Sequence, residues 1–123
     1  GRVDIQAGGE RFDAVGNRDN VFDDRAPDAV YVPPGHAVSL RARGDTEVAL
    51  CTAPGDGKPR AVRRIDPASM KRSVRGQGSN TRYVCDILPH DDPTAAHRPL
   101  TCCSPAPRGG WRRHRSTGPT IMP

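Results

Sequence analysis

The sequence predicts an all-β chain folded as a barrel or a sandwich. Short runs alternate between polar and apolar residues, as strands with one buried face do. Thirteen glycines and thirteen prolines provide turns between these runs, and apolar residues nowhere recur at helical spacing over three turns. Several short strands joined by Gly/Pro turns are typical of closed or stacked antiparallel sheets.

The first predicted element is a hairpin, followed by a separate strand. Residues 2–5 alternate in polarity, residues 7–10 supply a turn, and Phe12 and Val15 resume the apolar pattern. Residues 29–32 predict the next strand. Because the chain opens at Gly1 with a strand and not with Met, we expect it to be truncated at its start.

Three further strands follow a turn at Pro33-Pro34-Gly35. Val38, Leu40 and Ala42 alternate with polar residues and predict a half-buried strand. Apolar or β-branched residues predict strands over residues 47–52 and 82–88. Residues 68–74 could form one helical turn at most.

The predicted β domain covers residues 1–97, and residues 98–123 form a tail of different composition. The tail holds five of the 19 Lys and Arg residues, five prolines and no acid. The net charge of +5 therefore belongs to the tail, since the body has 14 basic and 14 acidic residues. Proline lacks an N–H and restricts its predecessor, so we expect an irregular tail. A frameshifted reading from about residue 97 is an alternative origin for it.

The four cysteines give no zinc pattern, because no C-x-x-C spacing or His pair accompanies them. Cys51 and Cys85 fall in apolar strand-like runs and are expected to be buried thiols. Cys102 and Cys103 lie in the predicted irregular tail. We therefore expect a cytoplasmic protein by default. No apolar run approaches the ~18 residues of a membrane span.

The Pro33–Gly35 turn resembles the second motif of cupin barrels. Metal-binding cupins carry a His ligand three residues after that glycine, where this chain has Val38. Valine has no lone pair to donate. His36 lies on the same strand face by parity, but we expect it to be a solvated residue near the turn.

No other group predicts catalysis. His90, Asp91 and Asp92 read as a solvated loop between prolines, and His97 and His114 stand alone. The pattern from Gly76 to Gly78 opens no helix and so predicts no phosphate site, and no serine or cysteine has an activating base. We predict no catalytic, cofactor-binding or metal-ligating residue in this chain.

Four segments in order resemble the 5-deoxy-glucuronate isomerase family, two-cupin enzymes of inositol catabolism. They are Val15–Phe22, Pro27–Gly35, Glu47–Pro54 and Arg75–Val84 continuing to Pro89. Asn17 departs from the family pattern, which runs directly from Gly to Arg. The resemblance implies an incomplete first cupin, and Gly109-Gly110-Trp111 approaches the family's metal segment before the match fails.

The resemblance implies an isomerase that converts 5-deoxy-glucuronate to 5-dehydro-2-deoxygluconate with a divalent metal in its second cupin. This chain alone is expected to hold no metal and to be inactive. The alternative is a metal-free cupin-like module that binds a sugar acid or a protein partner, and a nucleic-acid arm in the basic tail ranks third. The sequence predicts no membrane partner and leaves an oligomer open.

Overall fold

The computed structural model describes residues 1–20, 22–89 and 100–104 of the chain. Its regular elements there are short strands and two single-turn 3₁₀ helices, so the all-β prediction is confirmed. The strands are β1 (Val3–Ala7), β2 (Glu10–Val15), β3 (Ala29–Tyr31), β4 (Val38–Ala42), β5 (Arg63–Ile65), β6 (Lys71–Arg75), β7 (Arg82–Leu88) and β8 (Leu100–Ser104). The 3₁₀ helices are η1 (Pro67–Ser69) and η2 (Gly78–Asn80).

The first sheet has the order β2-β1-β4, and both of its pairings are antiparallel. The predicted hairpin of β1 and β2 is confirmed, with its turn at Gly8 and Gly9, which both have positive φ. The β1–β2 register shifts between Val3 and Ile5, where β2 contains a bulge. Ala14 in this bulge has φ 51°, and its N–H donates to Asp4 Oδ1 at 2.8 Å.

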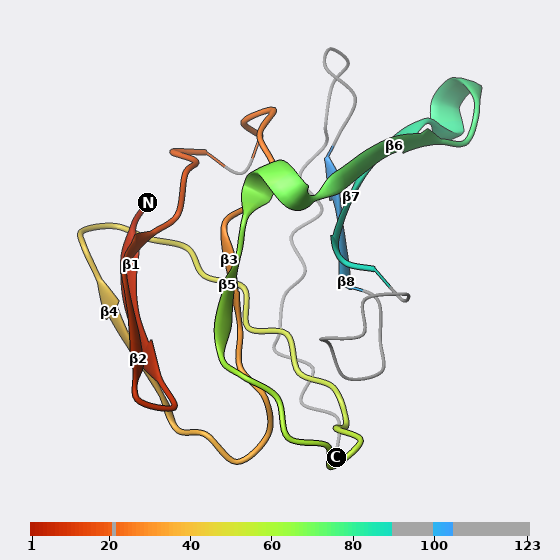
Figure 1. Ribbon diagram of the computed structural model, residues 1–123. Coiled ribbons are helices and arrows are strands. Elements are labelled where there is room, and N and C mark those ends of the chain that lie inside the picture. The colour runs from red at the N-terminus through yellow and green to blue at the C-terminus, as the bar shows by residue number, and fades with distance from the viewer. Residues whose placement is uncertain (21, 90–99, 105–123) are drawn as a thin grey trace, which may run out of the picture.

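The β3–β5 ribbon forms the middle layer between the two three-stranded sheets (Figure 1). Directly opposed residues of an antiparallel pair share a face. Ile65 therefore joins Ala29 on the face that packs against Met70, Cys85 and Leu88. Val30 lies on the other face, where it packs against the cluster of Val3, Ile5 and Val15. The ribbon thus divides the apolar interior into two clusters.

The third sheet has the order β6-β7-β8 and is antiparallel throughout. The connection from β6 to β7 includes Gly76, at φ 84°, and η2. Asp66 caps η1 by accepting a hydrogen bond from Ala68 N–H at 2.9 Å. The expectation of at most one helical turn near residues 68–74 is confirmed, although most of that stretch is strand β6.

Three sequence predictions are wrong in detail. Residues 47–52 form no strand, because no neighbouring strand pairs with them in the described part of the chain. Strand β4 is exposed along its whole length instead of half-buried, because the central ribbon covers β1 and not β4. Residues 100–104 of the predicted irregular tail form β8, a proline-free stretch that pairs with β7. The other tail residues lie outside the described ranges.

No helix among the described residues is long and apolar enough to cross a membrane.

Candidate functional site

The cupin-like turn at Pro33–Gly35 forms as predicted, with Gly35 at φ 87°. It does not place potential metal ligands together. His36 is exposed and lies beside the β1–β2 turn, since a methyl group on Gly8 would approach its Nδ1 to 3.0 Å. Val38 is also exposed. Over residues 1–20 and 22–89, no group of three His, Cys, Asp or Glu side chains is arranged to hold a metal ion.

The remaining residues considered for chemistry are dispersed or not described. Cys85 is buried as expected, and its thiol contacts the sulfur of Met70 at 3.8 Å. Cys51 is exposed, contrary to expectation, because the strand predicted around it does not form. The histidines and aspartates that we expect to be non-catalytic lie outside the described residues. They are His90, Asp91, Asp92, His97 and His114. Cys102 and Cys103 lie in β8.

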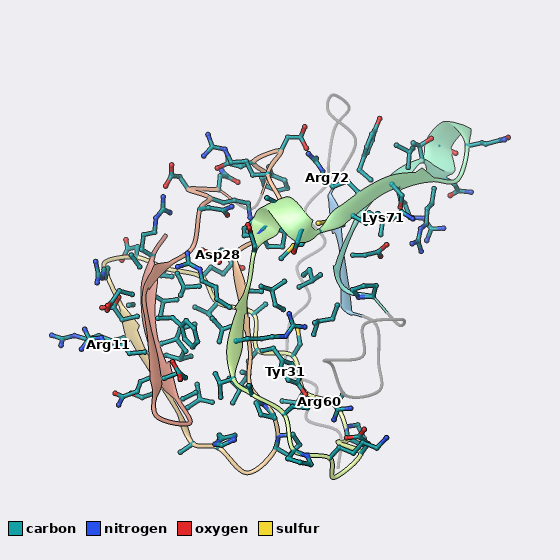
Figure 2. The ribbon with its side chains drawn as sticks, viewed as in Figure 1. Arg11, Asp28, Tyr31, Arg60, Lys71 and Arg72 are labelled. Atoms are coloured by element: carbon teal, nitrogen blue, oxygen red, sulfur yellow. The ribbon has the colours of Figure 1, made fainter. Side chains whose placement is uncertain are left out.

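A polar cluster at the end of the β3–β5 ribbon is the best candidate for ligand contact. Tyr31 and Arg63 are directly opposed, and the Arg63 guanidinium carbon lies 6.0 Å from the Tyr31 ring centre. Arg60 makes two hydrogen bonds to Asp56, of 2.5 and 2.7 Å, and both side chains are largely buried. Figure 2 shows Tyr31 and Arg60 in the same region, at the lower end of the β3–β5 ribbon.

Two polar atoms of this cluster have unused hydrogen-bonding capacity among the described residues. Tyr31 Oη and Arg60 Nε are buried, and neither has a hydrogen-bond partner among the described residues. The Asp56 hydrogen bonds hold the pKa of Arg60 above its usual value, so its guanidinium stays charged. A hydroxyl and a cationic N–H suit an oxygen ligand such as water or a carboxylate.

Sequence reasoning missed this cluster. Its only local signal is the spacing of Asp56 and Arg60, four residues apart in a Gly/Pro-rich segment. Tyr31 reaches it from another strand through pairing with β5. Since that pairing joins segments more than 30 residues apart, no local pattern could predict it.

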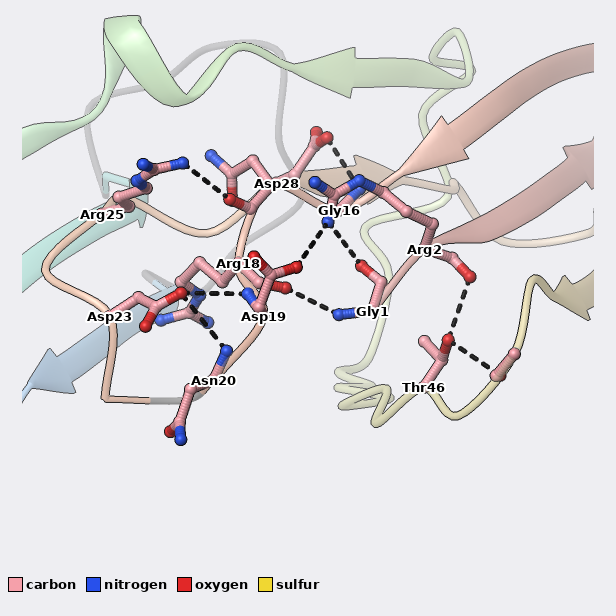
Figure 3. Close-up of polar contacts among 12 residues, drawn as sticks. Gly1, Arg2, Gly16, Arg18, Asp19, Asn20, Asp23, Arg25, Asp28 and Thr46 are labelled. Atoms are coloured by element: carbon pink, nitrogen blue, oxygen red, sulfur yellow. Dashed lines mark hydrogen bonds and ion pairs between the residues drawn. The ribbon is translucent and has the colours of Figure 1, made fainter.

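A second polar network fastens the segment from Gly16 to Asp28, which includes part of the family resemblance (Figure 3). The Gly16 N–H donates to Asp28 Oδ2 at 2.9 Å, and the N-terminal amino group donates to Arg18 C=O at 2.7 Å. The Asp23 carboxylate accepts hydrogen bonds from two backbone N–H groups, which lower its pKa. These contacts stabilise the loop, and among these described residues they do not form an acid–base pair suited to catalysis.

Asn17, the residue that departs from the family pattern, is part of the same network. Its Nδ2 donates to Ala26 C=O at 2.9 Å. Its Oδ1 is buried and has no hydrogen-bond partner in the described ranges. The amide therefore helps to close the loop.

A hollow of about 310 Å³ lies on the β6–β7 hairpin. It is lined by Arg72, Ser73, Val74, Tyr83, Val84 and Cys85. Ser73 Oγ is buried and unpartnered within the described structure. No His, Asp or Glu is among the described residues that line the hollow, so none of them can activate this hydroxyl as a base.

Comparison with known proteins identifies the family of this all-β chain. Residues 1–114 match the KduI/IolB family. The chain belongs to that family. The KduI/IolB match extends beyond β8, and the hypothesis of a frameshifted reading from about residue 97 stays a prediction.

Relatives within the KduI/IolB family carry a specific name. The chain is 37% identical over 111 residues to a 5-deoxy-glucuronate isomerase of Geobacillus kaustophilus (strain HTA426), covering 90% of this chain and 39% of that protein. It is 34% identical over 95 residues to a 5-deoxy-glucuronate isomerase of Bacillus subtilis (strain 168), covering 77% of this chain and 35% of that protein. The chain thus spans less than two fifths of the length of either relative.

A solved KduI/IolB relative shows the same fold. The crystal structure of an IolB-like protein from Salmonella typhimurium LT2 superposes with a TM-score of 0.66 at 35% sequence identity. The alignment covers 72% of this chain and 34% of that chain. The predicted resemblance to the isomerase family and the cupin-like all-β fold are therefore confirmed.

Proposed function

We propose that this chain supplies the first cupin-like part of a 5-deoxy-glucuronate isomerase that acts in inositol catabolism. The observation that carries the proposal is the family match over residues 1–114, together with 37% identity to a relative of that name. The proposal places the enzyme in the cytoplasm, and the exposed, unbridged thiol of Cys51 is compatible with a reducing compartment.

The proposed reaction moves a proton between C1 and C2 of an aldose acid, which gives the keto isomer. A divalent metal in the family enzyme would polarise the carbonyl group. The described residues of this chain do not fit such an ion, because Val38 offers no donor and His36 lies beside the β1–β2 turn. We therefore assign no metal ligand and no proton-transfer step to this chain.

In this proposal the chain contributes structure and polar contacts. The pair of buried atoms, Tyr31 Oη and Arg60 Nε, supports a secondary possibility that the chain itself binds a sugar acid without metal. Titration of the chain with 5-deoxy-glucuronate would measure this binding. Micromolar affinity that is lost in Tyr31→Phe would favour this binding module over the enzyme part.

The enzyme proposal is tested by joining this chain to the complementary part of the Geobacillus kaustophilus relative. We expect no isomerase turnover and no tightly held divalent metal for the chain alone, and metal-dependent turnover for the joined protein. The relative's complementary part alone is the control. A joined protein that folds and binds metal but does not isomerise 5-deoxy-glucuronate would refute the proposal.

A further inference from the structure

Strand β4 is an open edge of the first sheet. It pairs with β1 on one side, and no other described strand pairs with its outer side. Figure 1 shows β4 at the outer margin of the molecule. All five of its residues are exposed.

The backbone groups of β4 divide cleanly between its two sides. Arg43 N–H donates to Arg2 C=O at 2.9 Å, and the β1–β4 register from Ala42 to Val38 is unbroken. Hydrogen-bonded and non-hydrogen-bonded pairs alternate along an antiparallel ladder. Odd-numbered residues 39–43 therefore direct N–H and C=O groups toward β1, and even-numbered residues 38–42 direct theirs outward.

The same even-numbered residues are apolar and continue the core face of the sheet. Val38, Leu40 and Ala42 lie opposite Ala7, Ile5 and Val3, which are all buried. Val38 and Leu40 nevertheless remain 44% and 45% exposed. The apolar face of the sheet thus continues onto β4, where its side chains are exposed to solvent.

Two other described edge strands of the three-stranded sheets, β2 and β6, carry protective features that β4 lacks. Strand β2 has a bulge and three charged residues, and β6 carries Lys71, Arg72 and Arg75 among five. Bulges and edge charges are the devices that prevent sheets from pairing with each other. Strand β4 is regular and has one charge, Arg41.

We propose that β4 pairs with β4 of a second copy of this chain, antiparallel around a two-fold axis at Leu40. This register places Leu40 opposite Leu40 of the partner and Val38 opposite Ala42. The outward groups of both strands then form about six hydrogen bonds. Arg41 lies opposite Ser39, so no like charges meet. The contact is self-complementary, as a two-fold dimer requires, and it joins two three-stranded sheets into one.

The test measures the mass of the chain by sedimentation equilibrium over a range of concentrations. We expect a monomer–dimer equilibrium for the natural chain. Leu40→Pro removes an outward N–H that β1 does not use, and Leu40→Lys places two like charges face to face. Each substitution is expected to raise the dissociation constant of the dimer at least tenfold, which corresponds to about 1.4 kcal/mol. Val74→Lys is the control, because Val74 is exposed on β6, away from the proposed contact, and this variant should leave the dissociation constant unchanged. Circular dichroism checks that all variants fold.

A cross-linking experiment tests the register without weakening the fold. In a Cys51→Ser background, Leu40→Cys should give a disulfide-linked dimer on mild oxidation, because opposed Cα atoms at about 5.5 Å suit a disulfide. Val74→Cys in the same background is the matched control. A natural chain that stays monomeric at about 1 mM, or a dimer equally strong in both Leu40 variants, would overturn the proposal.

Discussion

Asp28 and Arg64 lie 36 residues apart in sequence and form a two-point ion pair, with N···O distances of 3.0 and 2.5 Å. The Asp28 side chain is 2% exposed, whereas that of Arg64 is 43% exposed. The same carboxylate accepts a hydrogen bond from Gly16 N–H. Burial raises the pKa of Asp28, but the hydrogen bonds from Arg64 and Gly16 outweigh it and hold this pKa below its usual value. One carboxylate thus joins the end of β2 to β5.

Asp28→Asn is expected to destabilise the chain by about 2–3 kcal/mol, because a buried two-point pair loses its charge. Urea denaturation measures this difference. Asp24→Asn is the control, since Asp24 pairs with Arg72 on the exposed surface and should change stability little. Equal losses in the two variants would show that the buried pair adds nothing beyond a surface pair.

The stabilisation from Asp28 should depend on pH in a defined direction. Since its pKa is lower in the folded than in the unfolded chain, the stabilisation is complete above the unfolded value, near 3.8, and disappears as the pH falls through the folded value. The stability difference between the natural chain and Asp28→Asn should therefore shrink below about pH 4. The lowered pKa values of Asp4 and Asp23 act in both proteins. A difference that stays constant down to pH 2 would contradict this assignment.

Gly76→Ala is expected to destabilise the chain more than Gly9→Ala, by at least about 1 kcal/mol. Both glycines have φ 84°, so both substitutions place an L side chain at a positive φ that such residues rarely adopt. At Gly76 the new methyl group would lie 2.2 Å from Asn80 C=O, whereas at Gly9 it would meet open space. Thermal unfolding of the two variants gives the comparison, and equal midpoints would argue against the close approach at Gly76.

Tyr31→Phe is expected to leave stability unchanged or to raise it by about 1 kcal/mol, because Tyr31 Oη is buried without a described partner. Phenylalanine keeps the ring that packs beside Arg63. Denaturant unfolding is again the measurement. A loss above about 1 kcal/mol would mean that the hydroxyl has a bonding partner in solution, such as an ordered water.

The isolated chain is expected to be marginally stable. No described side chain is completely buried, and six large apolar residues are exposed. Circular dichroism should show a weak or low thermal transition. A sharp transition above about 65 °C would exceed the usual range for a domain of this kind and contradict the expectation.

Local patterns predicted the strands whose side chains alternate clearly or form an apolar run. The β1–β2 hairpin, β3 and β7 are of this kind, with turns fixed by Gly and Pro. Strands β5 and β6 were not predicted, because Arg63-Arg64-Ile65 and Lys71–Arg75 contain one apolar residue each. They are strands because of their partners, β3 and β7.

The same reasoning explains the predictions that were wrong. Val48 and Leu50 have strand-like neighbours in sequence, but no described strand pairs with them, and both are exposed. Of the candidate site, the sequence predicted the turn at Pro33–Gly35. The cluster of Tyr31, Arg60 and Asp56 arises from long-range pairing, which local patterns do not contain.

The central position of the β3–β5 ribbon has a consequence for how the chain reaches its native state. Both apolar clusters contain side chains of this ribbon, and its strands are separated by residues 32–62. Neither cluster can be completed until the two ends of this long segment, which contains β4, have come together. Bringing them together costs entropy before any packing is gained. The β1–β2 hairpin can form early from local contacts. Packing of the two outer sheets then depends on the later pairing of β3 with β5. Folding should therefore be slow for a chain of this size and should reach both sheets together.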